Sequence, residues 1–280
     1  MRWIGPILGC ALWLTAPVVF ADAAAAHYRL AKTLRDDGRY EQALEQIDLA
    51  IAARPGYAQG HLTRGSILRR LGRYEQALKA YQRAIALEPK DGRALGLAGA
   101  MLLRLGRPKE AVSYLRKATA LEPGDANHWL NLGVAYRQSK NSGAAIATYR
   151  KALEVIPNDP LLLNNLGVAL RKARRYGEAI KAHEQAMAAD PYNPEVARNL
   201  AIAYRGAKRY KEAIPIYIKA IGLGDGGPDD LLFDLASCYD KVGNIDMAIE
   251  TFERYIKATE KSDPQAAQRA RRAVHNLEQK

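Results

Sequence analysis

The sequence has few of the groups from which catalytic and metal centres are built. It contains two cysteines, Cys10 and Cys238. The first lies in an N-terminal apolar stretch that we expect to be removed, so Cys238 is left alone and no internal disulfide is predicted. We interpret Cys238 as a small buried side chain rather than a reactive thiol. The chain also lacks a Gly-rich phosphate loop, a nucleophile elbow and a zinc motif, so we predict no enzyme, no cofactor and no metal.

The five histidines do not change this interpretation. His27, His61 and His183 fall at positions where packing within a helical repeat explains them. His128 and His275 have no His, Cys or carboxylate partner at the spacing of metal ligands. None of the five is therefore predicted to bind a metal.

Positive charge is in surplus, with 42 Lys and Arg residues against 30 Asp and Glu and a formal net charge of +12. Such a balance would suit nucleic acid, but predicted export and the lack of a basic patch interleaved with aromatic residues argue against that partner. We therefore expect the basic residues to serve another anionic partner.

The N-terminus resembles a secretion signal. A short positive start, Met1-Arg2, precedes an apolar run from Trp3 to Phe20, which ends in Val19-Phe20-Ala21 before Asp22 and so places the small Ala21 at the predicted cleavage position. We predict a signal peptide over residues 1–21 with cleavage after Ala21, and Ala23 as a second cleavage position. The remaining chain is then exported, and we predict a periplasmic location.

Three other interpretations of this stretch stay open. An uncleaved membrane anchor would keep the repeats outside, although the run is short and is interrupted by glycine and proline. The sequence Ile7-Leu8-Gly9-Cys10 is similar to a lipoprotein signal, but the apolar region before Cys10 is too short for that pathway. A cytoplasmic protein with an apolar first helix is the third alternative.

The rest of the chain is periodic. In the stretch from Trp129 to Pro157, the residues at characteristic spacing are Trp129, Leu132, Gly133, Tyr136, Ala145, Tyr149, Ala152 and Pro157. Five prolines follow one another at intervals of 34 residues: Pro55, Pro89, Pro123, Pro157 and Pro191. Small residues recur with them in two series, namely Ala31, Gly65, Gly99, Gly133, Gly167 and Ala201, then Ala43, Ala77, Ala111, Ala145, Ala179 and Ala213.

This pattern resembles the tetratricopeptide repeat (TPR) family, of the kind found in exported bacterial proteins, whose unit is a pair of helices of about 34 residues. The resemblance implies an all-α fold, a right-handed superhelical solenoid of about seven helix-turn-helix TPR repeats with a C-terminal capping helix. We predict repeats at residues 24–57, 58–91, 92–125, 126–159, 160–193, 194–228 and 229–262, followed by the capping helix at 263–280.

The resemblance also implies a groove lined by the first helices of successive repeats. Family positions that contact ligands carry Asn131, Asn165 and Asn199, a ladder of amides that could bind the backbone of an extended peptide. Another such position carries a row of arginines, interrupted by Leu103, that could bind carboxylates or phosphates: Arg35, Arg69, Arg137, Arg171 and Arg205. The alternative is that these arginines are solvated ends of helices, favoured there by the helix dipole.

Two classes of function follow. The first, which we prefer, is a non-catalytic scaffold that binds extended, acidic peptide segments of partner proteins during assembly of an envelope complex. Resemblance to exported bacterial TPR proteins suggests pilus or outer-membrane assembly, secretion or cytochrome maturation as settings. The second is a binding module for an anionic polymer or surface, such as a polysaccharide, a cell-wall polymer or lipid head groups. Self-association through the capping helix and the groove is compatible with either.

Overall fold

The computed structural model describes residues 16–224 and 228–279. Within these ranges the chain forms 15 helices and no strand, which confirms the predicted all-α class. The chain divides into two compact units, residues 1–131 and 132–280, and each is described by itself. The predicted signal peptide lies mostly outside the described residues. No helix in the described part is both long and apolar enough to cross a membrane.

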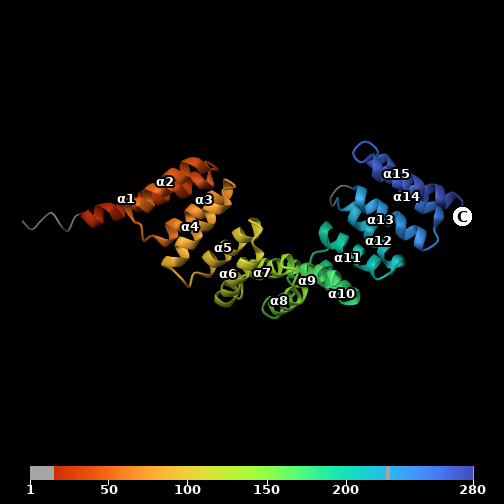
Figure 1. The fold of residues 1–280 in the computed structure, drawn as a ribbon, viewed down its shortest axis with the longest axis horizontal. Helices are drawn as coiled ribbons and strands as arrows, with labels where there is room; N and C mark the ends of the chain where they lie inside the picture. Colours follow the sequence, from red (N-terminus) through yellow and green to blue (C-terminus); the bar gives the residue numbers. More distant parts are fainter. Residues whose placement is uncertain (1–15, 225–227, 280) are drawn as a thin grey trace, which may run out of the picture. The chain divides into compact units, whose positions relative to one another are not determined.

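The first unit consists of consecutive helix pairs (Figure 1). Each helix packs against the next along the chain from α1 to α6. Their bounds are α1 (Ala16–Asp36), α2 (Tyr40–Ala53), α3 (Ala58–Arg70), α4 (Tyr74–Leu87), α5 (Gly92–Arg104) and α6 (Pro108–Leu121). The next helix, α7 (Ala126–Gln138), begins in this unit and ends in the second.

The second unit also consists of consecutive helix pairs. Two helices that each come first in their pair, α9 and α11, contact each other directly. Its helices are α8 (Ser142–Val155), α9 (Pro160–Lys172), α10 (Tyr176–Ala189), α11 (Pro194–Gly206), α12 (Tyr210–Gly222), α13 (Pro228–Lys241), α14 (Ile245–Thr259) and α15 (Pro264–Glu278). The last helix, α15, packs against α14 and buries Ala266, Ala267, Ala270 and Leu277. Its N-terminus is capped by the Asp263 carboxylate, which accepts from the Ala266 N–H at 2.9 Å.

The small residues of the first helices explain how the two helices of a pair come so close. A Cβ added at Gly133 would lie 2.2 Å from the Tyr149 ring, and one added at Gly167 would lie 2.5 Å from the His183 ring. No side chain of any size fits at such distances. The second helix therefore places a large residue directly on the backbone of the first.

The turns inside the repeats use the left-handed backbone conformation. Gly38 has a φ of 78° and closes α1: its N–H donates to Arg35 O at 3.1 Å, and the next N–H, of Arg39, donates to Leu34 O at 2.8 Å. This is the Schellman C-cap, which favours glycine because glycine has no Cβ. Later repeats have Lys140, Arg174 and Lys208 at this turn, in the same left-handed region with a φ of about 60°.

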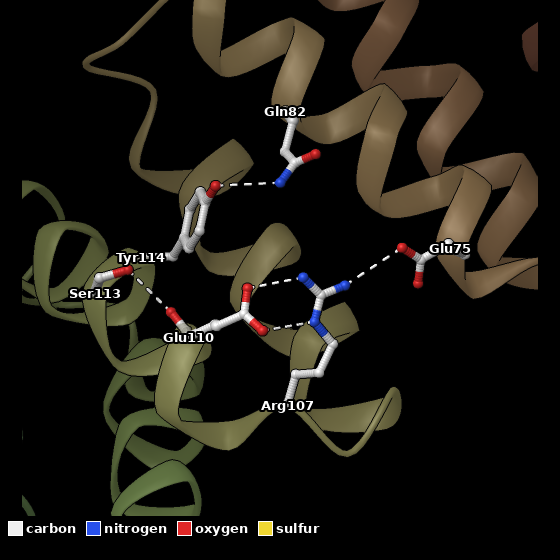
Figure 2. A network of polar contacts seen from close by, with 6 residues as sticks. All are labelled: Glu75, Gln82, Arg107, Glu110, Ser113 and Tyr114. Atoms are coloured by element: carbon white, nitrogen blue, oxygen red, sulfur yellow. Dashed lines mark hydrogen bonds and ion pairs between the residues drawn. The ribbon is translucent and has the colours of Figure 1, made fainter.

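Arginines in these turns bind glutamates in the first turn of the following helix. Arg107 donates to both carboxylate oxygens of Glu110 at 2.7 Å, and to Glu75 of the preceding repeat at 3.3 Å (Figure 2). Figure 2 also shows Gln82 donating to the Tyr114 hydroxyl at 3.2 Å, a second polar contact between α4 and α6. Glu75 and Glu110 are thus bound by an arginine of the protein itself.

Candidate functional site

All five arginines of the predicted row lie in the last turn of a first helix and are half-buried. The backbone there is held by the Schellman turns, so the position of each arginine along its helix is fixed. Arg35 is neutralised by its neighbour Asp36 at 2.7 Å. The other arginines of the row differ in whether a carboxylate of the protein neutralises the guanidinium. Arg171 and Arg205 of the second unit show this difference most clearly.

Arg171 has a buried Nε that finds no hydrogen-bond partner in the described part of the chain. Burial, followed by the positive charges of Arg205 and Arg198, lowers the pKa of Arg171. A guanidinium stays protonated even so, because its ordinary pKa lies above 12. The lowered pKa therefore reflects the burial of this guanidinium and the positive charges near it.

Arg205, one repeat further on, is partly neutralised. Its Nη2 lies 3.0 Å from Asp234 Oδ2, and the same carboxylate accepts from the Tyr217 hydroxyl at 3.1 Å. Burial acts against the charged form of Arg205, but Tyr217 and Asp234 outweigh it and raise its pKa. Burial, and then Asp234, raises the pKa of Tyr217, so this hydroxyl stays protonated as a donor.

Two clefts meet at Arg171. The first, of about 400 Å³, is lined by Arg171, Tyr176, Ile202, Arg205, Gly206, Tyr210, Ser237 and Lys241. The second, of about 530 Å³, is lined by Arg171, Arg198, Asn199, Ile202, Leu231, Phe233, Asp234, Tyr255 and Arg269. Both therefore combine arginines with aromatic and aliphatic walls. Forked guanidinium groups in such clefts suit carboxylates or phosphates.

Some residues of these clefts were not among the predicted site residues. Arg198 occupies the fifth position of its repeat, one of the ligand-contacting positions of the family, so a signal existed for it. Arg269 comes from α15, which the sequence pattern marks only as a capping helix. No spacing within a repeat could have brought Arg269 to α11 and α13.

The asparagines do not form a ladder of free amides. The Asn165 Nδ2 donates to Leu161 O of its own helix at 2.9 Å. Asn199 is buried, and its Nδ2 donates to Asn164 Oδ1 at 3.2 Å. Asn131 is half-buried and belongs to the first unit. At Asn165 and Asn199, at least one donor of the amide is thus already used within the protein.

Two predictions about single residues have opposite outcomes. Cys238 is buried and unpaired, as predicted, and burial raises the pKa of its thiol to about 11. The prediction that His128 lacks a carboxylate partner is wrong. Its Nε2 lies 2.9 Å from Glu122 Oε2 and 3.7 Å from Asp125 Oδ2. The turn between α6 and α7 folds these carboxylates back toward the ring.

Comparison with known sequences settles the family. A sequence model described as tetratricopeptide repeat matches residues 14–58, 62–126 and 102–162, which together make up more than half of the chain. Two further models of the same description match residues 170–221 and 204–273, and residues 148–181. The chain therefore belongs to the tetratricopeptide repeat family. No curated protein matches it significantly.

Solved structures share the fold. A tetratricopeptide repeat protein from Parabacteroides merdae is 16% identical with a TM-score of 0.66, covering 91% of this chain and 99% of its own. PilF of Pseudomonas aeruginosa is 21% identical with a TM-score of 0.61, covering 74% and 95%. YrrB, described as a TPR protein with an unusual peptide-binding site, is 19% identical with a TM-score of 0.57, covering 67% and 97%.

Proposed function

We propose that this chain is a non-catalytic scaffold that binds an extended, acidic peptide segment of a partner protein on the first-helix face of its second unit. The observation that carries the proposal is Arg171, a half-buried cation whose Nε is unpartnered among the described residues and which lines both clefts. Burial of an unpaired cation costs free energy, and a bound anion would offset that cost. Membership of a family whose repeats generally bind protein partners supports the same function.

The two clefts favour an extended ligand over a single small anion. Both contain Arg171 and Ile202, so one segment can place successive side chains in neighbouring clefts. The aromatic and aliphatic walls, including Tyr210 and Phe233, suit the apolar parts of a peptide. Arg198 and Arg205 add positive charge near Arg171 and favour acidic side chains over neutral ones.

The N-terminal apolar stretch supports export and, with it, a partner in a bacterial envelope complex. This part of the proposal rests on the sequence pattern of residues 1–21. It is tested separately, by N-terminal sequencing of the protein isolated from cells. A chain that begins at Asp22 or Ala24 agrees with signal cleavage, and one that begins at Met1 contradicts it.

A second candidate function is a binding module for an anionic polymer or surface. The hydrogen bonds of Asn165 and Asn199 within the protein favour it, because amides used internally are less available for a peptide backbone. The same arginines would then bind repeated anionic groups without reading peptide structure.

The experiment compares two charge variants with the same change in net charge. Arg171→Gln/Arg205→Gln removes the cations of the clefts. Lys172→Gln/Lys208→Gln removes two exposed cations within three residues of them in the sequence and serves as the control. Fluorescence anisotropy then measures binding of a short Glu-rich peptide, the matching Gln-rich peptide and an anionic polysaccharide.

We expect the Glu-rich peptide to bind the parent chain and the control alike, and the Gln-rich peptide not to bind. Loss of a hydrogen bond to a charged group is worth about 1.5 to 3 kcal/mol, so the arginine variant should bind roughly 10- to 100-fold more weakly. Binding should also weaken as salt rises. Equal loss in both variants would refute the assignment to the clefts, and binding of the polysaccharide alone would favour the second candidate.

A further inference from the structure

The turn that joins α6 to α7 brings three metal-ligating side chains together in the first unit. Glu122 follows the last residue of α6, Asp125 precedes α7, and His128 is in the first turn of α7. One ligand atom from each, His128 Nε2 and a carboxylate oxygen of Glu122 and of Asp125, all lie within 4.8 Å of one another. The imidazole is buried, whereas the two carboxylates are half-exposed, with side chains 41% and 38% accessible.

The backbone and a neighbouring side chain hold this arrangement. The Asp125 N–H donates to Glu122 O and the His128 N–H donates to Asp125 O, both at 3.2 Å. Asp125 Oδ1 accepts from the backbone N–H of Asn127 at 2.8 Å and from its Nδ2 at 3.0 Å. This orients the Asp125 carboxylate and leaves Oδ2 on the side of His128. Outer hydrogen bonds of this kind orient the ligands of metal sites.

Two glycines of α5 make the space for the cluster. A Cβ at Gly96 would lie 2.3 Å from His128 Cε1, and a Cβ at Gly92 would lie 2.7 Å from Glu122 Cδ. Positions one repeat away from Gly96 carry Leu62 and Leu130. The histidine is equally exceptional, since the corresponding residues of the other aligned repeats are Ala26, Gly60, Ala94, Leu162 and Val196. The repeat fold forms without either feature, so packing of the repeat does not require them.

We infer that Glu122, Asp125 and His128 form a binding site for a divalent transition metal, with Zn²⁺ as the ion that its donors suit best. One imidazole nitrogen and two carboxylate oxygens are ligands that Zn²⁺ takes at about 2.0 to 2.2 Å. The separations of 2.9 Å and 3.7 Å from Nε2 are close to those between neighbouring ligands of one such ion. The imidazole disfavours Mg²⁺ and Ca²⁺, which prefer oxygen donors.

The charges of the cluster also favour a divalent cation. The carboxylates of Glu122 and Asp125 both face His128 Nε2. This nitrogen carries at most one proton, so the two carboxylates would have to share it. A divalent cation neutralises both carboxylates and binds the nitrogen lone pair as well. Because three protein ligands leave at least one coordination position of Zn²⁺ open, water or a group from a partner completes the site on the exposed side.

The site has a defined structural effect. Glu122 lies near the end of the third repeat and His128 near the start of the fourth, and both pack against α5. A bound ion therefore joins the end of one repeat to the start of the next. Ligands that bind only the folded state stabilise it in proportion to the logarithm of their concentration over Kd, so Zn²⁺ should stabilise this junction. This inference is independent of the proposed function.

The test is isothermal titration of the full chain with Zn²⁺ in a buffer that does not chelate, next to four variants. His128→Gln and Asp125→Asn each remove one ligand, and the second keeps the shape of the side chain. Asn127→Ala removes an orienting contact. His275→Gln removes an exposed histidine of α15 and controls for adventitious binding to imidazole. Circular dichroism of each variant verifies its helix content.

We expect one Zn²⁺ per chain, unaffected by His275→Gln. Asn127→Ala should weaken binding by about 10- to 100-fold, the range for an outer-shell contact, and the two ligand variants by at least as much. Co²⁺ in place of Zn²⁺ should give a visible absorption spectrum that is lost in Asp125→Asn. If no saturable binding is found, or if Asp125→Asn and His128→Gln bind Zn²⁺ as the parent chain does, the cluster is an ion pair and the inference is wrong.

Discussion

The buried imidazole of His183 should make the stability of the second unit fall in mildly acidic solution. His183 is fully buried on α10 against Gly167, and neither of its ring nitrogens has a hydrogen-bond partner within the described ranges. Burial, and then the charge of Arg171, lowers its pKa from the ordinary 6.5 to about 4. Unfolding exposes the ring and restores the ordinary value.

The direction of the effect follows from proton uptake. Between pH 6.5 and about 4 the unfolded chain binds a proton at His183 that the folded chain does not bind, so acid favours unfolding in this window. Each unit of separation between the two pKa values is worth about 1.4 kcal/mol. For this separation the free energy of unfolding should drop by about 2 kcal/mol from pH 7 to pH 5 because of this residue alone.

The assay compares the parent chain with His183→Leu, because Leu115 occupies the corresponding position of the third repeat. Urea denaturation followed by circular dichroism gives the free energy of unfolding at several pH values. The other histidines contribute equally to both proteins, so the difference between the two isolates His183. We expect that difference to grow by about 2 kcal/mol in favour of the leucine variant between pH 7 and pH 5. A difference that does not change with pH would refute the reasoning.

Further predictions concern the helix pairs, the turns and the surface. Gly133→Val forces a side chain into the Tyr149 ring and should lower the free energy of unfolding by about 1 to 3 kcal/mol, measured by urea denaturation. Gly177→Val, in open space on α10, controls for helix propensity, and an equal loss there would contradict the steric explanation. Arg174→Gly relieves a left-handed residue and should raise the free energy of unfolding by about 1 kcal/mol, whereas an unchanged midpoint would show that the turn is not strained. Arg107→Ala should leave the thermal midpoint unchanged, because the ion pairs in Figure 2 are exposed, and a clear loss would show that they matter for stability.

The fold could be predicted because each repeat places the same kinds of residues at the same packing positions. A glycine such as Gly65 is weak as a single observation, but its recurrence opposite Tyr81, with Gly99 opposite Leu115, identifies the contact between two helices. Regular prolines then give the length of the unit. Both signals depend on sequence spacing alone, which explains why the helix class and the family were predictable.

The candidate site was less predictable because it depends on side-chain geometry. Arg171 and Arg205 lie in the predicted row, yet the sequence does not show which arginine finds a counterion: Arg205 meets Asp234 and Arg35 meets Asp36. The availability of the asparagines depends on geometry in a similar way, since a rotamer decides whether Asn165 donates to its own helix or to a ligand. The spacing of the residues also does not show that the turn before α7 brings Glu122 and Asp125 close to His128.

Gly92 and Gly96 of α5 also restrict which repeat can follow the third one. His128 fits over Gly96, but after the second repeat the same imidazole would meet the side chain of Leu62. A chain with its repeats shuffled would keep its composition and its helices, yet it would lose this junction. Repeats of the same spacing therefore differ in the neighbours that they fit, and this junction requires the third and fourth repeats to be adjacent.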